Sequence, residues 1–353
     1  MGIRSTALYG GTIPAGEESA SLDVVRALVV TPESLSGLLA ANPSFFERIT
    51  LAVCDEGHLL DSDSRGISLE LLLARFKARQ PLPPRFVFMS AIVPNIAEIN
   101  SWLGGSDSSV LHSDYRPAIA EFSVLRPAGA GVNTRVALEM HPHEEDVNRY
   151  QIERFLEKRH FQYTNPQSGK LKTHTFKSYK AQAVAAARIS LPIGTVAVFA
   201  ANKRGKQGAI GLAEELLSQL EVPLNLPLPI TFANGSIDPV VEYLTSEYGA
   251  DWIGSQMVKH GAVLHHGDIP QETREVLERL IRSDCCKMVI CTSTLAEGVN
   301  LPIRTLVLYS VIRRNKAGTS TNLLARDIKN LVGRAGRAGS NTKGLVILSL
   351  IHI

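Results

Sequence analysis

The segment LAVCDEGHLL, residues 51–60, joins a short apolar run to two adjacent carboxylates, a glycine and a histidine. The run ITLAVC (49–54) has the length and composition of a buried strand, so Asp55 and Glu56 stand where that strand would end. Two carboxylates in contact repel each other, and removing them from water raises the free-energy cost of keeping both ionised. One interpretation is a strand that reaches the surface and turns. The other is a pair that binds Mg²⁺ and activates water at the mouth of a nucleotide site.

Apolar runs of this kind alternate with amphipathic helical patterns along the chain. We expect further strands at VRALVV (25–30), RFVFMS (85–90), GTVAVFAA (194–201), GAVLHHG (261–267), KMVICTS (287–293) and RTLVLYSV (304–311). We expect helices at ESLSGLLAAN (33–42), LELLLARFKAR (69–79), QGAIGLAEELLSQL (207–220) and PQETREVLERLIR (270–282). Such alternation predicts parallel α/β sheets, and its two blocks predict two α/β domains.

Composition limits the remaining possibilities. The chain has 353 residues, of which 44% are hydrophobic and 20% charged, and its net charge is only +3. Any nucleic-acid-binding surface must therefore be local. Cys54, Cys285, Cys286 and Cys291 show neither metal-ligand spacing nor a disulfide framework, which fits a reducing, cytoplasmic location. No apolar run is long enough to span a membrane, so no membrane partner is expected.

The middle of the chain, residues 121–178, departs from the alternation. Its stretch Arg149–Lys180 holds eight Lys or Arg against two acids. Six aromatic residues are interleaved with them: Tyr150, Phe155, Phe161, Tyr163, Phe176 and Tyr179. The turn signal NPQSGK predicts a hairpin. One interpretation is a single-stranded nucleic-acid contact; the other is a solvated insertion whose aromatics pack on the nearer domain. His141 and His143 are interpreted as part of a loop.

Several short stretches follow one another in a fixed order. They are YGGT (9–12), VVTPESL (29–35), CDEGH (54–58), MSAIVPN (89–95), VFAANKRG (198–205), LHHGDIPQETR (264–274), CTSTLAEGVNLP (291–302) and NLVGRAGRAG (330–339). This series resembles the superfamily 2 DExH helicases and, within them, the superkiller-type branch. The resemblance covers residues 9–347, apart from the middle segment.

The resemblance implies two RecA-like parallel-sheet domains in tandem, with an inserted α+β segment between them. It also implies ATP and Mg²⁺ as cofactors and hydrolysis at the cleft between the domains. That hydrolysis would drive movement from 3′ to 5′ along a single strand. The expected partner is single-stranded or partly duplex nucleic acid. DNA is preferred over RNA because the variant motifs resemble a bacterial subgroup.

Residue roles in the first domain also follow from the resemblance. Asp55 would hold Mg²⁺ through water, Glu56 would hold the metal and orient the attacking water, and His58 would connect the ATP site to the other domain. Contacts with the nucleic-acid backbone are expected from Gly10, Gly11, Thr31 and Pro32. Without the resemblance, Thr31 and Pro32 would be a helix N-cap followed by a first-turn proline, and both interpretations can hold together.

In the second domain, Arg334 and Arg337 would act as arginine fingers on the γ-phosphate. Nearby glycines argue against an ordinary basic helix face, because several glycines in one short helix are costly. Thr292 would contact a backbone phosphate. The other implied contacts are Glu297, Gly298, Asn330 and Gly333 to the nucleotide, and Asn300 to the strand.

Three features depart from the family pattern. The usual Ser-Ala-Thr is Ser90-Ala91-Ile92, which loses a hydroxyl that couples hydrolysis to unwinding, so translocation is better supported than strand separation. Asn330 replaces a glutamine. No G-x-x-x-x-G-K-[ST] phosphate loop occurs in the 353 residues, so we expect this polypeptide to hydrolyse ATP poorly.

We expect a partial first domain at 1–120, a connector with the basic insertion at 121–178 and a second domain at 179–347. We expect the chain to be truncated at both ends and poorly soluble. The ending LSLIHI (348–353) matches a translated sequencing adapter and is expected to be an artefact, although Gly344–Leu348 also suits a strand. The alternative function is a non-catalytic nucleic-acid-binding module, or a subunit of a bacterial defence or repair assembly.

Overall fold

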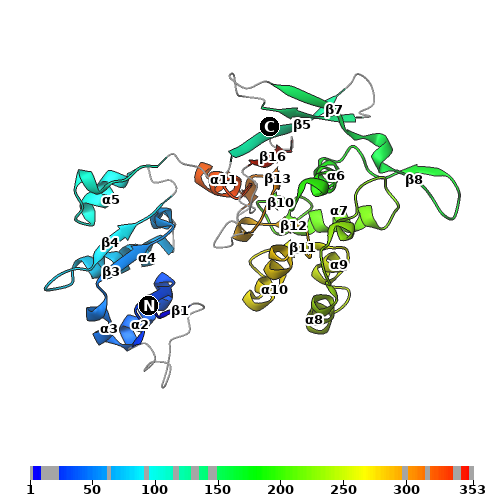
Figure 1. Ribbon diagram of the computed structural model, residues 1–353. Coiled ribbons are helices and arrows are strands. Elements are labelled where there is room, and N and C mark those ends of the chain that lie inside the picture. The colour runs from blue at the N-terminus through cyan, green and yellow to red at the C-terminus, as the bar shows by residue number, and fades with distance from the viewer. Residues whose placement is uncertain are drawn as a thin grey trace. The chain divides into compact units, whose positions relative to one another are not determined.

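The computed structural model describes residues 3–8, 24–61, 65–90, 95–113, 119–128, 135–141, 149–295, 301–314, 319–336 and 343–349. The chain divides into two compact units, Met1–Asp114 (unit 1) and Tyr115–Ile353 (unit 2). Both units are α/β, as the alternating sequence pattern predicts (Figure 1). Among the described residues, no helix is long and apolar enough to cross a membrane.

Unit 1 contains two pairs of parallel strands. Strand β1 (Ser5–Leu8) pairs with β2 (Ala27–Val30), and β3 (Leu51–Cys54) pairs with β4 (Arg85–Phe88). The helical elements are α2 (Pro32–Ala41), α3 (Pro43–Arg48), η2 (Gly57–Asp61), α4 (Arg65–Lys77), α5 (Ile96–Trp102) and η3 (Asp107–Ser109). Strands β2, β3 and β4 and helices α2 and α4 lie where the sequence predicts them, whereas β1, α3, α5, η2 and η3 were not predicted.

The strands of unit 1 are covered on one side only, which corrects the expectation of fully buried strands. A small core of helix residues packs against the partly buried Leu28 and Phe86; its members are Leu38, Leu39, Phe45, Leu72 and Phe76. The alternate strand residues are exposed: Val29 by 68%, Leu51 by 51%, Val53 by 56% and Val87 by 39%. Because successive strand residues point to opposite faces, one apolar face of these strands is open to solvent in the described structure.

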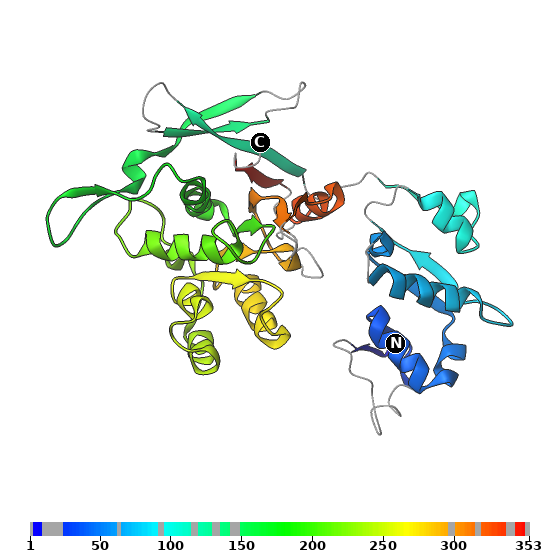
Figure 2. The same cartoon turned by 180° about the vertical axis from the view of Figure 1, so that it is seen from behind.

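Unit 2 is built on an eight-stranded sheet in the order β11-β12-β10-β13-β16-β5-β6-β7 (Figures 1 and 2). Its strands are β5 (Ile119–Ala128), β6 (Arg135–Met140), β7 (Tyr150–Glu157), β10 (Val196–Ala200), β11 (Ala262–His265), β12 (Met288–Cys291), β13 (Thr305–Ser310) and β16 (Lys343–Leu348). Neighbouring strands from β11 to β5 are parallel, whereas β6 and β7 are antiparallel additions. The connection after β10 runs to β11 on one side of the sheet, and the connection after β13 runs to β16 on the other side. The topological switch point therefore lies between β10 and β13.

Helices cover both faces of the unit 2 sheet. The helical elements are η4 (Lys158–Phe161), α6 (Tyr179–Ser190), η5 (Leu191–Ile193), α7 (Ala209–Leu220), η6 (Pro229–Phe232), α8 (Asp238–Tyr248), α9 (Ile253–Lys259), α10 (Gln271–Arg282), η7 (Ser293–Leu295) and α11 (Ala325–Val332). Val198 and Ile290 belong to one core, with α6 and α7. Val289 and Leu308 belong to the other core, with α10 and α11. The near-continuous apolar strands of the sequence therefore reflect burial on both faces.

The middle segment joins unit 2. Strand β5 pairs along its first half with β16, which lies more than 200 residues later, and β6 and β7 extend the same sheet. The expected hairpin is confirmed as β8 (Gln162–Thr164) and β9 (Leu171–Thr173). A second hairpin comprises β14 (Ile312–Arg314) and β15 (Ser320–Asn322). The functional domain boundaries remain predictions, but β5, β6 and β7 are part of the unit 2 sheet.

The expected strand at Gly344–Leu348 is confirmed within β16, where Leu348 pairs with both Leu308 and Val124. The last four residues of the suspected adapter segment, 350–353, lie outside the described part of the chain.

Candidate nucleotide and nucleic-acid sites

The acidic pair follows β3 directly, as the sequence predicts. The Met89 N–H donates to Cys54 O and the Gly57 N–H donates to Met89 O, each at 2.8 Å, so this turn is held to the end of β4. A Cβ atom on Gly57 would lie 2.2 Å from the Phe88 ring, so only glycine fits here without a shift. The end of the β3–β4 pair and the absence of a side chain at Gly57 together fix the positions of Asp55 and Glu56.

The backbone of Glu56 adopts a conformation that is unfavourable for any residue with a side chain. Its φ is +53°, in the left-handed region. Its N–H donates to Asp55 Oδ1 at 2.8 Å, and its Oε2 lies 3.3 Å from His58 Nδ1. A non-glycine residue in this region costs about 1–2 kcal/mol. Strain of this type is often found at functional sites.

The acidic pair fits a magnesium ion that is shared with a phosphate ligand. Among the described residues, no group of three or more His, Cys, Asp or Glu side chains could hold a metal. Magnesium is commonly bound through one or two carboxylates, substrate phosphate oxygens and water. The phosphate loop that would complete such a site is absent from the 353 residues. The two carboxylates of Asp55 and Glu56 are therefore compatible with Mg²⁺ only together with phosphate oxygens and water.

Two other predicted positions in unit 1 are described. Thr31 caps α2: its Oγ1 accepts from the Ser34 N–H at 3.2 Å, and Pro32 is the first helical residue. The capping interpretation is therefore confirmed. Ser90 follows β4, and its buried Oγ has no hydrogen-bond partner among the described residues. Such a hydroxyl is available to a ligand or to a neighbouring segment.

In unit 2, side chains gather at the carboxyl ends of three adjacent strands. Lys203 follows β10, His266 follows β11, and Thr292 with Thr294 follow β12. Thr292 Oγ1 lies 3.3 Å from Thr294 Oγ1, which lies 3.4 Å from His265 Nδ1. This edge, beside the switch point between β10 and β13, is where open α/β sheets bind ligands.

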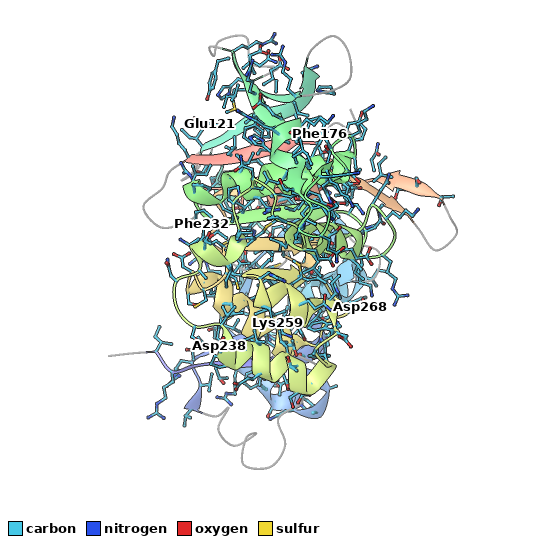
Figure 3. The ribbon with its side chains drawn as sticks, turned by 90° about the vertical axis from the view of Figure 1, so that its right-hand side faces the viewer. Glu121, Phe176, Phe232, Asp238, Lys259 and Asp268 are labelled. Carbon is cyan, nitrogen blue, oxygen red and sulfur yellow. The ribbon has the colours of Figure 1, made fainter. Side chains whose placement is uncertain are left out.

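The electrostatics of this edge favour an anion. Burial, together with the nearby charges of Lys203, His265 and Arg274, lowers the pKa of His266 to about 4. His266 Nδ1 and Arg274 Nε are buried without hydrogen-bond partners among the described residues. Lys203 is paired with Asp268, which is labelled in Figure 3. Two cations, an unpaired ring nitrogen and hydroxyls can hold a phosphate without reading a base.

Sequence reasoning predicted Thr292 here but missed Lys203, His266, Arg274 and Thr294. The sequence did contain a signal, because a polar side chain follows each strand end within three residues. These side chains are Lys203 after β10, His266 after β11 and Thr292 after β12.

Residues 333–336, directly after α11, are not helical. Helix α11 ends at Val332, so Gly333 and Arg334 stand outside it, and Asn330 is in its last turn. Gly336 donates its N–H to Ile303 O at 2.8 Å. Its φ is +89°, a backbone conformation that favours glycine over residues with a side chain. The arrangement of Arg334 and Arg337 on one helical face is therefore not tested, since Arg337 lies outside the described residues. The other predicted residues outside them are Gly10, Gly11, Ala91, Glu297, Gly298 and Asn300.

Two known protein families match this chain, one in each unit. The DEAD/DEAH box helicase family matches residues 1–99, and the helicase conserved C-terminal domain matches residues 233–339. The chain belongs to the superfamily 2 helicases of the DEAD/DEAH-box type, and its two α/β units are consistent with two RecA-like domains. Membership of the superkiller-type branch stays a prediction.

Curated relatives extend along nearly the whole chain. Hachiman protein HamB of Bacillus cereus is 28% identical over 99% of this chain and 30% of its own length. ATP-dependent DNA helicase Hel308 of Thermoplasma volcanium is 25% identical over 91% of this chain and 38% of its own length. DNA polymerase theta of Drosophila melanogaster is 27% identical over 98% of this chain. The chain thus spans well under half the length of these relatives.

Proposed function

We propose that the chain is the motor part of an ATP-dependent nucleic-acid helicase or translocase that moves 3′ to 5′ along a single strand. The observation that carries this proposal is the Asp55–Glu56 turn at the carboxyl end of β3, where a strained backbone presents two carboxylates. The helicase families matched by both units support the assignment.

The chemistry assigned to the acidic pair divides between its two members. Asp55 would hold Mg²⁺ through water, and Glu56 would hold the water that attacks the γ-phosphate. When bound, Mg²⁺ offsets the repulsion between the two carboxylates and polarises the phosphate oxygens. His58, 3.3 Å from Glu56 Oε2, would position that carboxylate.

Residues of unit 2 complete the proposed reaction. Arg334 and Arg337 would stabilise charge on the γ-phosphate, as arginine fingers do in related enzymes. Contacts with the nucleotide are proposed for Glu297, Gly298, Asn330 and Gly333. Ser90 and Ala91 would couple hydrolysis to the strand. Dependence on both units would make ATP turnover require a conformational step.

Strand binding is assigned to backbone contacts. Thr292 and Asn300, with the cluster of Lys203, His266 and Arg274, would hold phosphates in unit 2. Thr31, Pro32, Gly10 and Gly11 would do so in unit 1. Hydroxyls, cations and backbone N–H groups position a strand without reading its sequence. DNA is the preferred substrate, which is supported by relatives that are named DNA helicases.

One observation favours a second candidate function. Because no phosphate loop occurs in the 353 residues, we propose that the chain alone hydrolyses ATP poorly. A protein without that loop in its complete reading frame would be a nucleic-acid-binding module, either alone or as a subunit of a defence or repair assembly. Asp55 and Glu56 would then have no catalytic use.

The two candidates are separated by sequencing and expressing the complete open reading frame that carries these residues. The motor proposal predicts a phosphate loop in that frame and ATP hydrolysis that rises when single-stranded DNA is added. Arg334→Ala should abolish the stimulated rate, whereas Lys329→Ala, an exposed charge on α11, should leave it unchanged. Strand binding without any hydrolysis by the complete protein would establish the binding module instead.

A further inference from the structure

A basic arm projects from unit 2. We define it as residues 158–177, which comprise η4, the β8–β9 hairpin and the segment that leads into α6. Figures 1 and 2 both show the hairpin extending beyond the helices α6 and α7 that cover the sheet. Its pairing is antiparallel over three residues on each strand.

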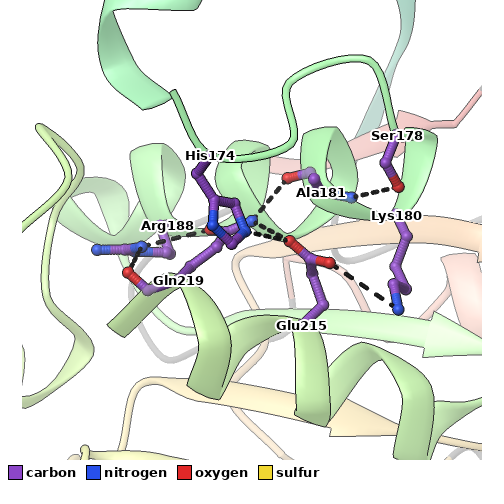
Figure 4. Close-up of polar contacts among 7 residues, drawn as sticks. All are labelled: His174, Ser178, Lys180, Ala181, Arg188, Glu215 and Gln219. Atoms are coloured by element: carbon purple, nitrogen blue, oxygen red, sulfur yellow. Dashed lines mark hydrogen bonds and ion pairs between the residues drawn. The ribbon is translucent and has the colours of Figure 1, made fainter. Parts of the chain in front are cut away.

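The root of the arm is fixed to the core. Phe161 and Phe176 are 0% and 5% exposed, and their rings meet edge to face at 5.1 Å. The His174 N–H donates to Phe161 O at 2.8 Å, and Gln182 Nε2 donates to Phe176 O at 2.9 Å. Figure 4 shows His174 Nε2 beside Glu215 Oε1 on α7, at 3.1 Å. The arm therefore leaves unit 2 in a defined direction.

The tip of the arm has a defined turn. Asn165 Oδ1 accepts hydrogen bonds from the N–H groups of Gln167 and Ser168, at 3.1 and 2.9 Å. The Asn165 N–H donates to Lys170 O at 2.9 Å, and Gly169 takes a φ of +64°. A side-chain-capped turn of this kind orders the loop without any partner.

The charged side chains of the arm are all of positive type. Between Glu157 and Glu214 the chain has no Asp or Glu. Arg159 pairs with Glu157, just outside the arm. Four further cations are exposed and form no ion pair with another described residue: Lys158, Lys170, Lys172 and Lys177. Lys170 and Lys172 are two apart, so they project from the same face of the ribbon.

The aromatics of the arm itself, residues 158–177, point inward, which decides the kind of contact that the arm can make. Phe161 and Phe176 are core residues, and Phe155 and Tyr163 pack against the same core. The packing interpretation is thus confirmed for these four aromatics, whereas Tyr150 and Tyr179, which lie outside the arm, are 53% and 44% exposed. Base stacking is therefore not available on the arm itself. Exposed lysines without stacking rings recognise phosphate charge, which is denser along a duplex than along a single strand.

We infer that the basic arm binds the phosphate backbone of duplex DNA, as a second contact beside the single-strand site. This inference rests on the proposed function. A two-stranded ribbon also has the dimensions that a DNA major groove admits. The contact would hold the double-stranded part of a partly duplex substrate without reading its sequence.

The test removes the two lysines that share a face. Lys170→Ala with Lys172→Ala is compared with a control, Lys259→Ala with Arg279→Ala, which removes two exposed cations elsewhere in unit 2. Figure 3 labels Lys259 well away from Phe176 at the root of the arm. Affinity is measured from low to moderate salt for a blunt duplex and a single strand, each of about 20 nucleotides in length, because backbone contacts are salt-dependent.

The arm variant should bind the duplex roughly tenfold more weakly at low salt, with a slope of log K against log salt reduced by about 1.8. Its single-strand affinity should stay within about twofold of the unsubstituted chain, and the control should match that chain on both ligands. Equal duplex affinity in the arm variant and the control overturns the inference, and so does an equal loss on both ligands. If the unsubstituted chain binds only the single strand, the arm inference alone fails. If it binds neither ligand, the proposed function fails as well.

Discussion

Asp55 accepts a hydrogen bond from the backbone N–H of the next residue, Glu56, at 2.8 Å, and Glu56 sits at φ +53°. The carboxylate of one acid thus stabilises the strained backbone of the other. This local bond keeps one Asp55 oxygen occupied and leaves the other for a ligand. The turn is specified by β3, by the close approach of Gly57 to Phe88, and by this hydrogen bond.

The backbone strain predicts an increase in stability when Glu56 is replaced by asparagine, which tolerates the left-handed region. Glu56→Asn should raise the free energy of unfolding of unit 1 by roughly 0.5–1 kcal/mol, whereas Glu56→Gln should leave it unchanged. Urea unfolding can be followed through Trp102 of unit 1 in a Trp252→Phe background, since the chain has two tryptophans. Equal stability of the two Glu56 variants would show that the backbone carries no strain.

His266 should respond to nucleic acid. Its pKa is about 4 because of burial and because of the nearby Lys203 and Arg274 charges. A bound phosphate would offset those charges and raise the pKa. NMR titration of labelled histidines with and without a single-stranded oligonucleotide measures this. His260, at the end of α9, is the control. An unchanged His266 pKa in the saturated complex would remove this histidine from the strand site.

The same histidine makes stability pH-dependent. An unfolded histidine takes up a proton near pH 6.5, whereas folded His266 does so only near pH 4. The unfolded state therefore binds more protons between these values, so the free energy of unfolding falls as the pH drops from 6.5 to 4. His266→Asn should flatten the profile of unit 2 in this window. A profile that keeps its slope in the variant would assign the effect to other groups.

The strand site in unit 2 predicts graded losses of affinity. Lys203→Ala and Arg274→Ala should each reduce the salt slope of single-strand binding by about 0.7, because each removes one phosphate contact. Thr292→Val should weaken binding about fivefold with no change of slope, because it removes one uncharged hydrogen bond. Fluorescence anisotropy across a salt series distinguishes these outcomes, with Lys329→Ala as control. A salt slope that is the same in all variants would place the strand elsewhere.

The exposed strand face of unit 1 should promote self-association. Val53 and Val87 are paired across β3 and β4 and are 56% and 39% exposed. Replacing both with threonine should lower the fraction of oligomers in sedimentation velocity, with little effect on stability. Leu171→Thr, at a position 66% exposed on the arm, is the matched control and should have no effect. Persistent association in the paired variant would point to another surface.

Much of this architecture follows from the sequence, for identifiable reasons. The strands β10, β12 and β13 are buried throughout because helices cover both faces, and this burial produces the mostly apolar runs from which they were predicted. The acidic pair was found because it interrupts such a run at its end.

Other features depend on contacts that the local sequence does not contain. The pairing of β5 with β16 joins residues more than 200 positions apart, so residues 121–178 were predicted to be a connector with an insertion. Phe161 and Phe176 looked like a stacking surface because a basic, polar stretch surrounds them, and only the fold turns them inward. The cluster of His266, Arg274 and Lys203 forms only when the ends of β10 and β11 and the first turn of α10 come together.

The central claim is that Glu56 orients the attacking water in a nucleic-acid-stimulated ATPase. The most direct measurement is the rate of ATP hydrolysis by the complete open reading frame, with and without single-stranded DNA, for the unsubstituted protein and for Glu56→Gln. We expect DNA to stimulate the unsubstituted protein, and Glu56→Gln to lower the stimulated rate at least about a hundredfold while its affinity for DNA is retained. Stimulated hydrolysis that survives in Glu56→Gln would contradict the account.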